Sequence, residues 1–152
     1  MRSVISKHLN ADPALMVVGT ARDGEEALRR VAQLRPDVVT LDVEMPALDG
    51  LDTLQQLMAQ HPTPVVMLSS HTQQGARTTI RALMRGAVDF VAKPEEAQAL
   101  PTVMAELIEK IKSAAGARPT ALPPRNLGSA PLLPHRLGLR PWQIGDRLVI
   151  IG

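Results

Sequence analysis

The sequence predicts an α/β fold in which helices cover a parallel β-sheet. Short apolar runs at residues 15–18, 38–41, 65–68 and 90–92 recur about every 25 residues. A segment with helical periodicity follows each run. This alternation is typical of parallel strands joined by right-handed helical crossovers.

The helical segments can be located by their apolar stripes and their end signals. We expect a first helix from Met1, with Val4, Ile5 and Leu9 on one face. Asp23 and Asp49 are placed to cap the next helices, and Gly86 to end a later one in a left-handed conformation. The remaining stripes are Ala27, Leu28, Val31 and Leu34; Leu51, Leu54, Leu57 and Met58; Ala76, Ile80, Leu83 and Ala87; and Val103, Leu107, Ile108 and Ile111.

Composition divides the chain into two regions of opposite net charge. Residues 1–116 hold 12 Lys and Arg against 14 Asp and Glu, a net charge of −2, whereas residues 117–152 hold five Arg against one Asp, a net charge of +4. These arginines are scattered among prolines with a single aromatic residue, so we expect no nucleic-acid partner. No apolar run approaches the roughly 20 residues that cross a bilayer, so we expect no membrane insertion. The absence of cysteine fits a cytoplasmic location.

A proline-rich segment follows the α/β region. Residues 117–146 contain six prolines and three glycines without sustained periodicity, which is typical of an extended linker. The apolar run at residues 147–152 then predicts the first strand of another α/β domain. We therefore expect a domain over residues 1–116, a linker over 117–146 and the start of a second domain over 147–152.

Two charged residues stand where predicted strands end. Asp42 follows the run at residues 38–41, and Lys93 follows the run at residues 90–92. Ligands of open α/β sheets bind at the carboxyl ends of the strands. A carboxylate and an ammonium there suit an anion that is first held covalently and then ion-paired. Pro94 predicts a strained or cis bond after Lys93.

The segments around these residues resemble a known family. Residues 40–50 read TLDVEMPALDG, residues 64–70 read PVVMLSS and residues 88–94 read VDFVAKP. They resemble the receiver domain of response regulators, and most of all the receiver of the chemotaxis protein-glutamate methylesterases, the CheB type. The resemblance covers residues 1–116 and implies a doubly wound, flavodoxin-like parallel sheet of strand order 2-1-3-4-5.

The resemblance implies a role for several residues. Asp42 would be the phosphoacceptor, which takes a phosphoryl group from a phosphohistidine donor and forms an acyl phosphate. Lys93 would pair with the phosphoryl group, and the Ser69 hydroxyl would bind a phosphoryl oxygen, although the adjacent Ser70 is an alternative. Phe90 matches the aromatic residue whose rotamer reports phosphorylation, but it could equally be an ordinary core residue.

The resemblance also implies parts that this sequence does not show. Receivers have a first strand ending in an acidic pair, which holds Mg²⁺ together with the phosphoacceptor and a backbone carbonyl, here Asp42 and the carbonyl of Glu44. Without that pair we expect an incomplete Mg²⁺ site. The absent strand would be central, and burying about four apolar side chains is worth roughly 6 to 12 kcal/mol, which rivals the stability of a whole domain. We therefore expect the chain to fold poorly alone and to be a fragment or the product of a misplaced start.

These observations leave more than one function open. The first is a phosphorelay receiver that regulates a methylesterase catalytic domain, with a chemotaxis-type sensor histidine kinase as phosphodonor and chemoreceptors as indirect partners. The catalytic serine, histidine and aspartate of that family lie outside these 152 residues, so we expect no ester hydrolysis by this chain. The alternatives are a receiver with another output, such as DNA binding, or a non-functional fragment. No Gly-rich phosphate loop follows any strand, which argues against a nucleotide-binding domain.

Overall fold

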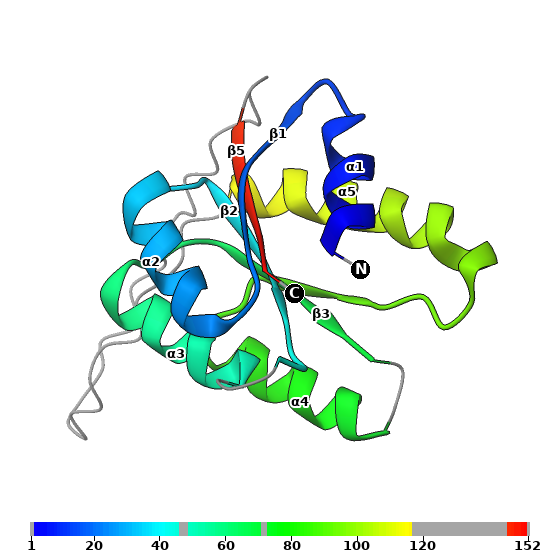
Figure 1. Ribbon diagram of the computed structural model, residues 1–152. Coiled ribbons are helices and arrows are strands. Elements are labelled where there is room, and N and C mark those ends of the chain that lie inside the picture. The colour runs from blue at the N-terminus through cyan, green and yellow to red at the C-terminus, as the bar shows by residue number, and fades with distance from the viewer. Residues whose placement is uncertain (1, 46–48, 71–72, 117–145, 152) are drawn as a thin grey trace.

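The computed structural model has five parallel strands in one sheet, with helices on both faces (Figure 1). It describes residues 2–45, 49–70, 73–116 and 146–151, with the backbone alone for residues 2, 73–76 and 146–151. The strands are β1 (Leu15–Ala21), β2 (Val38–Asp42), β3 (Val65–Ser69), β4 (Asp89–Ala92) and β5 (Asp146–Ile151). The helices are α1 (Arg2–Asn10), α2 (Gly24–Leu34), α3 (Gly50–Gln60), α4 (Gln73–Met84) and α5 (Leu100–Ala115), and a 3-10 turn, η1 (Ala97–Ala99), precedes α5.

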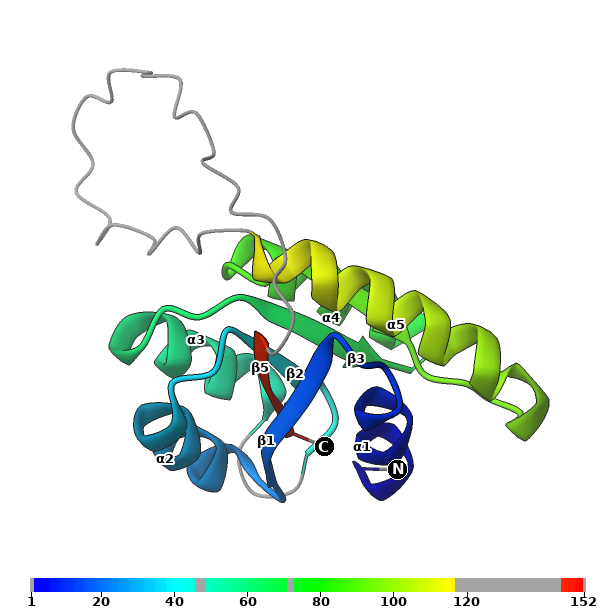
Figure 2. The same ribbon diagram turned by 90° about the horizontal axis from the view of Figure 1, so that it is seen from above.

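The doubly wound fold is confirmed by two separate hydrophobic cores, one on each face of the sheet. α2 and α3 pack on one face, where Val31, Leu54 and Leu57 are fully buried against Leu41 of β2. α1 and α5 pack on the other, and Figure 2 shows these two helices on the side away from α2 and α3. Leu9, Leu107 and Ile111 are the fully buried large residues of that second core. Strands buried on both faces read as continuous apolar runs, which is why β2 and β3 lack alternation.

One interior strand of the sheet comes from the last described segment of the chain. The strand order is β1-β5-β2-β3-β4, and β5 runs between β1 and β2 (red in Figure 1). The sequence predicts a second domain from residue 147, whereas the structure places residues 146–151 in the first domain's sheet. The expectation of poor folding depended on an empty central position, and β5 fills that position here.

The helices between the strands divide between the two faces of the sheet. From β1 to β4 the chain crosses the sheet in one direction, with α2 and α3 on one face. α5, which follows β4, packs on the opposite face.

The predicted helix ends are confirmed by the structure. The Asp23 carboxylate accepts a hydrogen bond from the Glu26 N–H at 2.8 Å, and the Asp49 carboxylate accepts one from the Leu51 N–H at 3.0 Å. Each caps the first turn of a helix, α2 and α3 respectively. Gly86 has a φ of 105°, so it adopts the left-handed conformation after α4 that favours glycine.

The predicted inner face of α4 is wrong. Ile80 and Leu83 were assigned to the buried stripe, yet they are 60% and 40% exposed. Thr79 and Ala82 face inward instead and are 5% and 0% exposed. Apolar residues lie around much of this helix, so periodicity alone does not identify the side that contacts the sheet.

Candidate functional site

Asp42 and Lys93 form an ion pair at the carboxyl edge of the sheet. Asp42 is the last residue of β2, and Lys93 directly follows β4. The Lys93 Nζ lies 2.6 Å from the Asp42 Oδ2, and the two side chains are only 19% and 9% exposed. The Lys93 N–H donates to the Ser69 carbonyl at 2.8 Å, which fixes the backbone of Lys93 beside β3. The predicted juxtaposition of the carboxylate and the ammonium is therefore present.

Glu44 joins this pair through its side chain, which the sequence analysis did not predict. Its backbone N–H donates to the Asp42 Oδ1 at 2.9 Å and so holds the second carboxylate oxygen. Its carboxylate lies 3.8 Å from the Lys93 Nζ and accepts a hydrogen bond from the Ser70 hydroxyl at 2.7 Å. The only local indication in the sequence was that Glu44 is an acidic residue two positions after Asp42.

Both candidate serines lie at this edge of the sheet. Ser69 ends β3 and is 3% exposed, and its hydroxyl donates to the Ser70 carbonyl at 3.3 Å. Ser70 is less buried, and its hydroxyl contacts Glu44. The geometry brings both serines to the neighbourhood of the ion pair, so the choice between them stays open.

Phe90 lies on β4 with its side chain turned outward, 38% exposed. The Lys110 Nζ of α5 donates to the Phe90 carbonyl at 2.6 Å and lies 4.9 Å from the centre of the ring. Partial burial lowers the pKa of Lys110, but hydrogen bonds to Glu106 and Asp89 outweigh this effect, and the pKa is raised above its ordinary value. Lys110 therefore stays charged beside the ring, where a cation is favoured.

Gly50 sets how closely α3 approaches Asp42. Its N–H donates to the Val43 carbonyl at 3.2 Å, so the chain returns to the strand end at the start of α3. A methyl group on Gly50 would collide with the Asp42 carbonyl oxygen and lie 2.8 Å from the Val43 Cα. The close approach of Gly50 to the backbone of Asp42 and Val43 could not be recognised without the structure.

The described residues do not supply a complete Mg²⁺ site. No group of three or more His, Cys, Asp or Glu side chains in the described part of the chain is arranged to hold a metal ion. Asp42 and Glu44 are the carboxylates at this edge, and Lys93 and a backbone N–H already engage the Asp42 oxygens. β5 adds no carboxylate here, because Ile151 is the residue that pairs with Leu41, next to Asp42.

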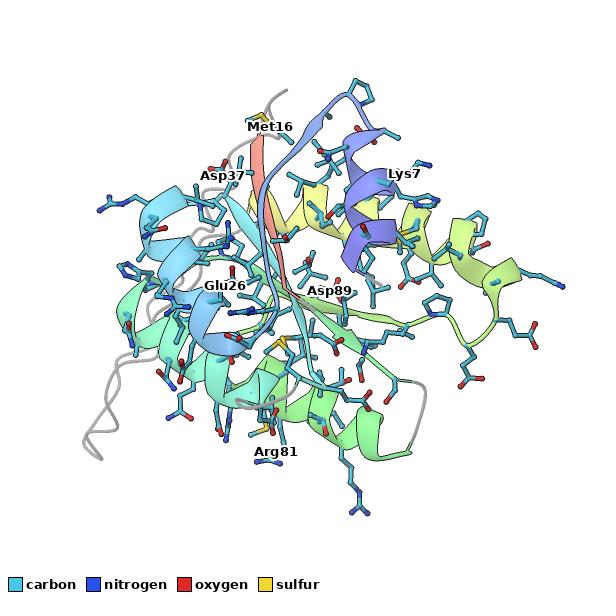
Figure 3. The ribbon with its side chains drawn as sticks, in the orientation of Figure 1. Lys7, Met16, Glu26, Asp37, Arg81 and Asp89 are labelled. Atoms are coloured by element: carbon cyan, nitrogen blue, oxygen red, sulfur yellow. The ribbon has the colours of Figure 1, made fainter. Side chains whose placement is uncertain are left out.

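Asp37 and Asp42 lie at opposite ends of β2. Asp37, labelled in Figure 3, directly precedes β2, whereas Asp42 is its last residue. Of the two alternatives expected after Lys93, a strained or a cis bond, the cis bond is absent, since no peptide bond within the described ranges is cis. A trans bond already directs the Lys93 ammonium to Asp42.

The chain matches known proteins over most of its length. Residues 1–105 match the family described as the response regulator receiver domain. A protein-glutamate methylesterase/protein-glutamine glutaminase of Symbiobacterium thermophilum is 59% identical over 121 residues, which cover 78% of this chain and 33% of that protein. A protein of the same name from Bacillus licheniformis is 42% identical over 160 residues, covering 100% of this chain and 44% of that protein. The chain thus spans less than half the length of these relatives.

Solved structures give the same assignment. The response regulator domain of Thermotoga maritima CheB matches with a TM-score of 0.72 and 44% identity, covering 78% of this chain and 90% of that domain. The receiver domain of NtrX from Brucella abortus matches less well, with a TM-score of 0.58 and 34% identity over 71% of this chain and 89% of that one. The chain therefore belongs to the response-regulator receiver domain family, and it is a receiver of the CheB type.

Proposed function

We propose that Asp42 is the phosphoacceptor of this receiver. The observation that carries the proposal is the buried ion pair, with the Lys93 Nζ 2.6 Å from the Asp42 Oδ2. The Asp42 carboxylate would attack the phosphorus of a phosphohistidine, the P–N bond would break, and an acyl phosphate would form until water hydrolyses it. Lys93 would then move from the carboxylate to the new phosphoryl oxygens, which carry more negative charge.

The neighbouring polar side chains support the same reaction. The Ser69 or Ser70 hydroxyl would donate to a phosphoryl oxygen, and either requires a change from its present acceptor, the Ser70 carbonyl or the Glu44 carboxylate. The phosphoryl group would also repel Glu44, which lies 3.8 Å from the same ammonium. Release of Ser70 from Glu44 is therefore a local consequence of charging Asp42. Mg²⁺ would be the ion that assists this reaction, with the Asp42 carboxylate and the Glu44 backbone carbonyl among its ligands.

Phosphorylation of Asp42 would regulate a methylesterase. The curated relatives carry the name protein-glutamate methylesterase/protein-glutamine glutaminase, and the Bacillus licheniformis match extends across the whole of this chain. We propose that the phosphorylated receiver loosens its contact with such a catalytic domain in the cytoplasm, and so affects chemoreceptors indirectly. A chemotaxis-type histidine kinase would be the phosphodonor. In the described part of the chain, no helix combines the length and apolarity needed to cross a membrane.

The proposed division of the chain follows from this function. Residues 1–116 would be the receiver and 117–146 a linker, of which residues 117–145 lie outside the described residues. Residues 147–152 would begin the catalytic domain in a longer protein, although residues 147–151 pair with β1 and β2 here. Reading the gene beyond Gly152 tests this division, because a helix-turn-helix pattern there would point to a DNA-binding output instead.

Labelling with a small phosphodonor tests the role of Asp42. The wild-type chain, Asp42→Asn and Asp37→Asn are incubated with ³²P-labelled acetyl phosphate with and without Mg²⁺. We expect label that hydroxylamine removes, as it does from an acyl phosphate, in the wild type and in Asp37→Asn. Asp37 is the matched control because it lies at the opposite end of β2 from Asp42 (Figure 3). Undiminished labelling of Asp42→Asn would overturn the proposal.

A further inference from the structure

A cleft of about 350 Å³ lies between α3 and the end of α4, two helices that pack side by side (Figure 1). It is lined by Gln55, Met58 and Ala59 of α3 and by Arg85, the residue that follows α4. This volume falls within the range of small-molecule pockets, roughly 300 to 1,000 Å³. The lining residues are separate from the Asp42 ion pair and its partners, so the cleft has no part in the proposed phosphoryl transfer.

The backbone of Arg85 is fixed at the end of α4. Its N–H donates to the Arg81 carbonyl at 3.1 Å and to the Ala82 carbonyl at 3.0 Å. Gly86, the next residue, lies against Met58, since a methyl group added to Gly86 would be 3.5 Å from the Met58 Cγ. Met58 is itself 7% exposed. The fold therefore holds the base of the Arg85 side chain and the neighbouring thioether in fixed positions.

The guanidinium of Arg85 lacks a well-placed acceptor. Its Nη1 is buried and has no hydrogen-bond partner within the part of the chain that the structure describes. The Asp52 Oδ1 lies 3.5 Å from this nitrogen, at an ion-pair distance but without a hydrogen bond, and the Asp52 side chain is 59% exposed. A buried donor without an acceptor costs free energy. The guanidinium would therefore be stabilised by an acceptor that is better placed than Asp52.

The walls of the cleft indicate which kind of molecule would supply this acceptor. A guanidinium binds carboxylates and phosphates through paired N–H donors. Because there is one guanidinium and the Asp52 carboxylate lies beside it, a singly charged anion fits better than a doubly charged phosphate. Met58 and Ala59 offer apolar atoms to a hydrocarbon chain. These features together favour a carboxylate that carries an apolar chain.

We propose that the cleft between α3 and α4 binds a small monocarboxylate with a short apolar chain. The ligand carboxylate accepts hydrogen bonds from the Arg85 guanidinium, and the chain lies along Met58 and Ala59. Asp52 and Ala59 share one side of α3, since they are seven residues apart, so Asp52 stands beside the cleft and turns to water when the ligand binds. Asp52 thus competes with the ligand for the guanidinium.

Titration of the ¹⁵N-labelled full chain with hexanoate, followed by amide chemical shifts at constant pH and ionic strength, tests the proposal. We expect saturable shifts that centre on residues 55–59 and 85–86. Acetate lacks the apolar chain and 1-hexanol lacks the charge, so each should bind at least about 10-fold more weakly. Equal midpoints for all three compounds, or shifts that centre on another part of the chain, would overturn the proposal.

Variants of the two charged residues should change the affinity in opposite directions. Arg85→Gln should weaken hexanoate binding by at least about 10-fold, because the charged donors are lost. Asp52→Asn should strengthen it by about 3-fold, because the competing carboxylate is removed. Arg81→Gln is the matched control, since it removes an exposed arginine one turn earlier on α4 (Figure 3) and should change the midpoint by less than about 2-fold. Undiminished binding by Arg85→Gln, or weaker binding by Asp52→Asn, would refute the proposal.

Two further measurements cover the case in which Arg85→Gln does not fold. Arg85→Lys keeps the charge but lacks the planar pair of donors, so its affinity should fall between those of the wild type and Arg85→Gln, or at least about 3-fold below the wild type. A ligand that binds only the folded chain also raises the urea midpoint. Hexanoate should raise the midpoint of Asp52→Asn more than that of the wild type, and the absence of a rise in both chains would overturn the proposal.

Discussion

The ion pair between Lys93 and Asp42 predicts a measurable loss of stability when the lysine is removed. Lys93→Met leaves the Asp42 carboxylate, whose side chain is 9% exposed, without its cationic partner. Breaking a fully buried pair in this way costs about 3 to 5 kcal/mol. The cost should be smaller here because the Glu44 N–H still bonds to Oδ1 and the Lys93 side chain is 19% exposed. We expect Lys93→Met to lower the free energy of unfolding by about 2 kcal/mol.

A double-mutant cycle separates this pairing from other effects of the substitution. Asp42→Asn keeps an oxygen that can accept the Glu44 N–H, and Lys93 can then turn to Glu44 or to water, so this variant should lose about 1 kcal/mol. The double variant Lys93→Met/Asp42→Asn no longer contains a buried unpaired charge. It should therefore be more stable than Lys93→Met alone, with a coupling free energy of about 1 to 2 kcal/mol.

Urea unfolding followed by circular dichroism at 222 nm measures all four chains. A loss of 2 kcal/mol lowers the urea midpoint by about 1 M for a domain of this size. Lys112→Met is a suitable control, because it removes a lysine from another ion pair that is more exposed, at 29%. Additive losses in the Asp42 cycle, or a Lys93→Met loss below about 0.5 kcal/mol, would show that the pair is not a buried, coupled unit.

Three further predictions concern single residues. Gly50→Ala should lower the free energy of unfolding by about 1 to 3 kcal/mol and reduce phosphoryl labelling of Asp42, because an added methyl group would collide with the backbone of Asp42 and Val43. Urea unfolding measures the loss of stability, and labelling with acetyl phosphate measures the loss of phosphorylation. Asp12 accepts a hydrogen bond from Lys112 at 2.8 Å, and this bond, together with one from the Ala14 N–H, lowers the pKa of Asp12 below its usual 3.8. The ionised Asp12 carboxylate therefore stabilises the fold above pH 3.8, and this stabilisation is lost as the pH falls through the lower pKa of the folded state. Asp12→Asn should therefore lose about 0.5 to 1 kcal/mol at pH 7, and a difference from the wild type that persisted at pH 2 would contradict this reasoning. Thr40 is fully buried, and its hydroxyl has no hydrogen-bond partner among the described residues. Thr40→Val should therefore increase the free energy of unfolding by about 1 kcal/mol and raise the thermal midpoint. A lowered midpoint would contradict this reasoning and indicate that the hydroxyl has a partner.

Much of the fold and part of the site could be predicted from the sequence. Val38 to Leu41 and Val65 to Leu68 are buried on both faces, so their apolar runs identify central strands directly. Asp42 and Lys93 could be placed together because parallel strands end at one edge. The caps at Asp23 and Asp49 depend only on local hydrogen bonds, which sequence spacing determines.

The parts that the sequence did not predict depend on distant contacts. The inner face of α4 is determined by packing rather than by its apolar period, so Ile80 was misassigned. The Glu44 carboxylate accepts a hydrogen bond from Ser70, which is 26 residues away in the sequence, and nothing local to either residue indicates that contact. Residues 147–152 have the pattern of a strand in any α/β domain, and nothing local to them indicates that residues 147–151 pair with β1 and β2.

The location of β5 between β1 and β2 affects the order in which this sheet can form during synthesis. β2, β3 and β4 can pair as they leave the ribosome, since they follow one another in the chain and in the sheet. β1 is synthesised before these strands, but Leu15 cannot pair with Asp146 until β5 has been synthesised. Pairing across so large a separation slows folding and exposes unpaired strand edges in the meantime. Among the described strands, β1 therefore has no pairing partner until residues 146–151 have been synthesised, and its unpaired edge favours aggregation during that interval.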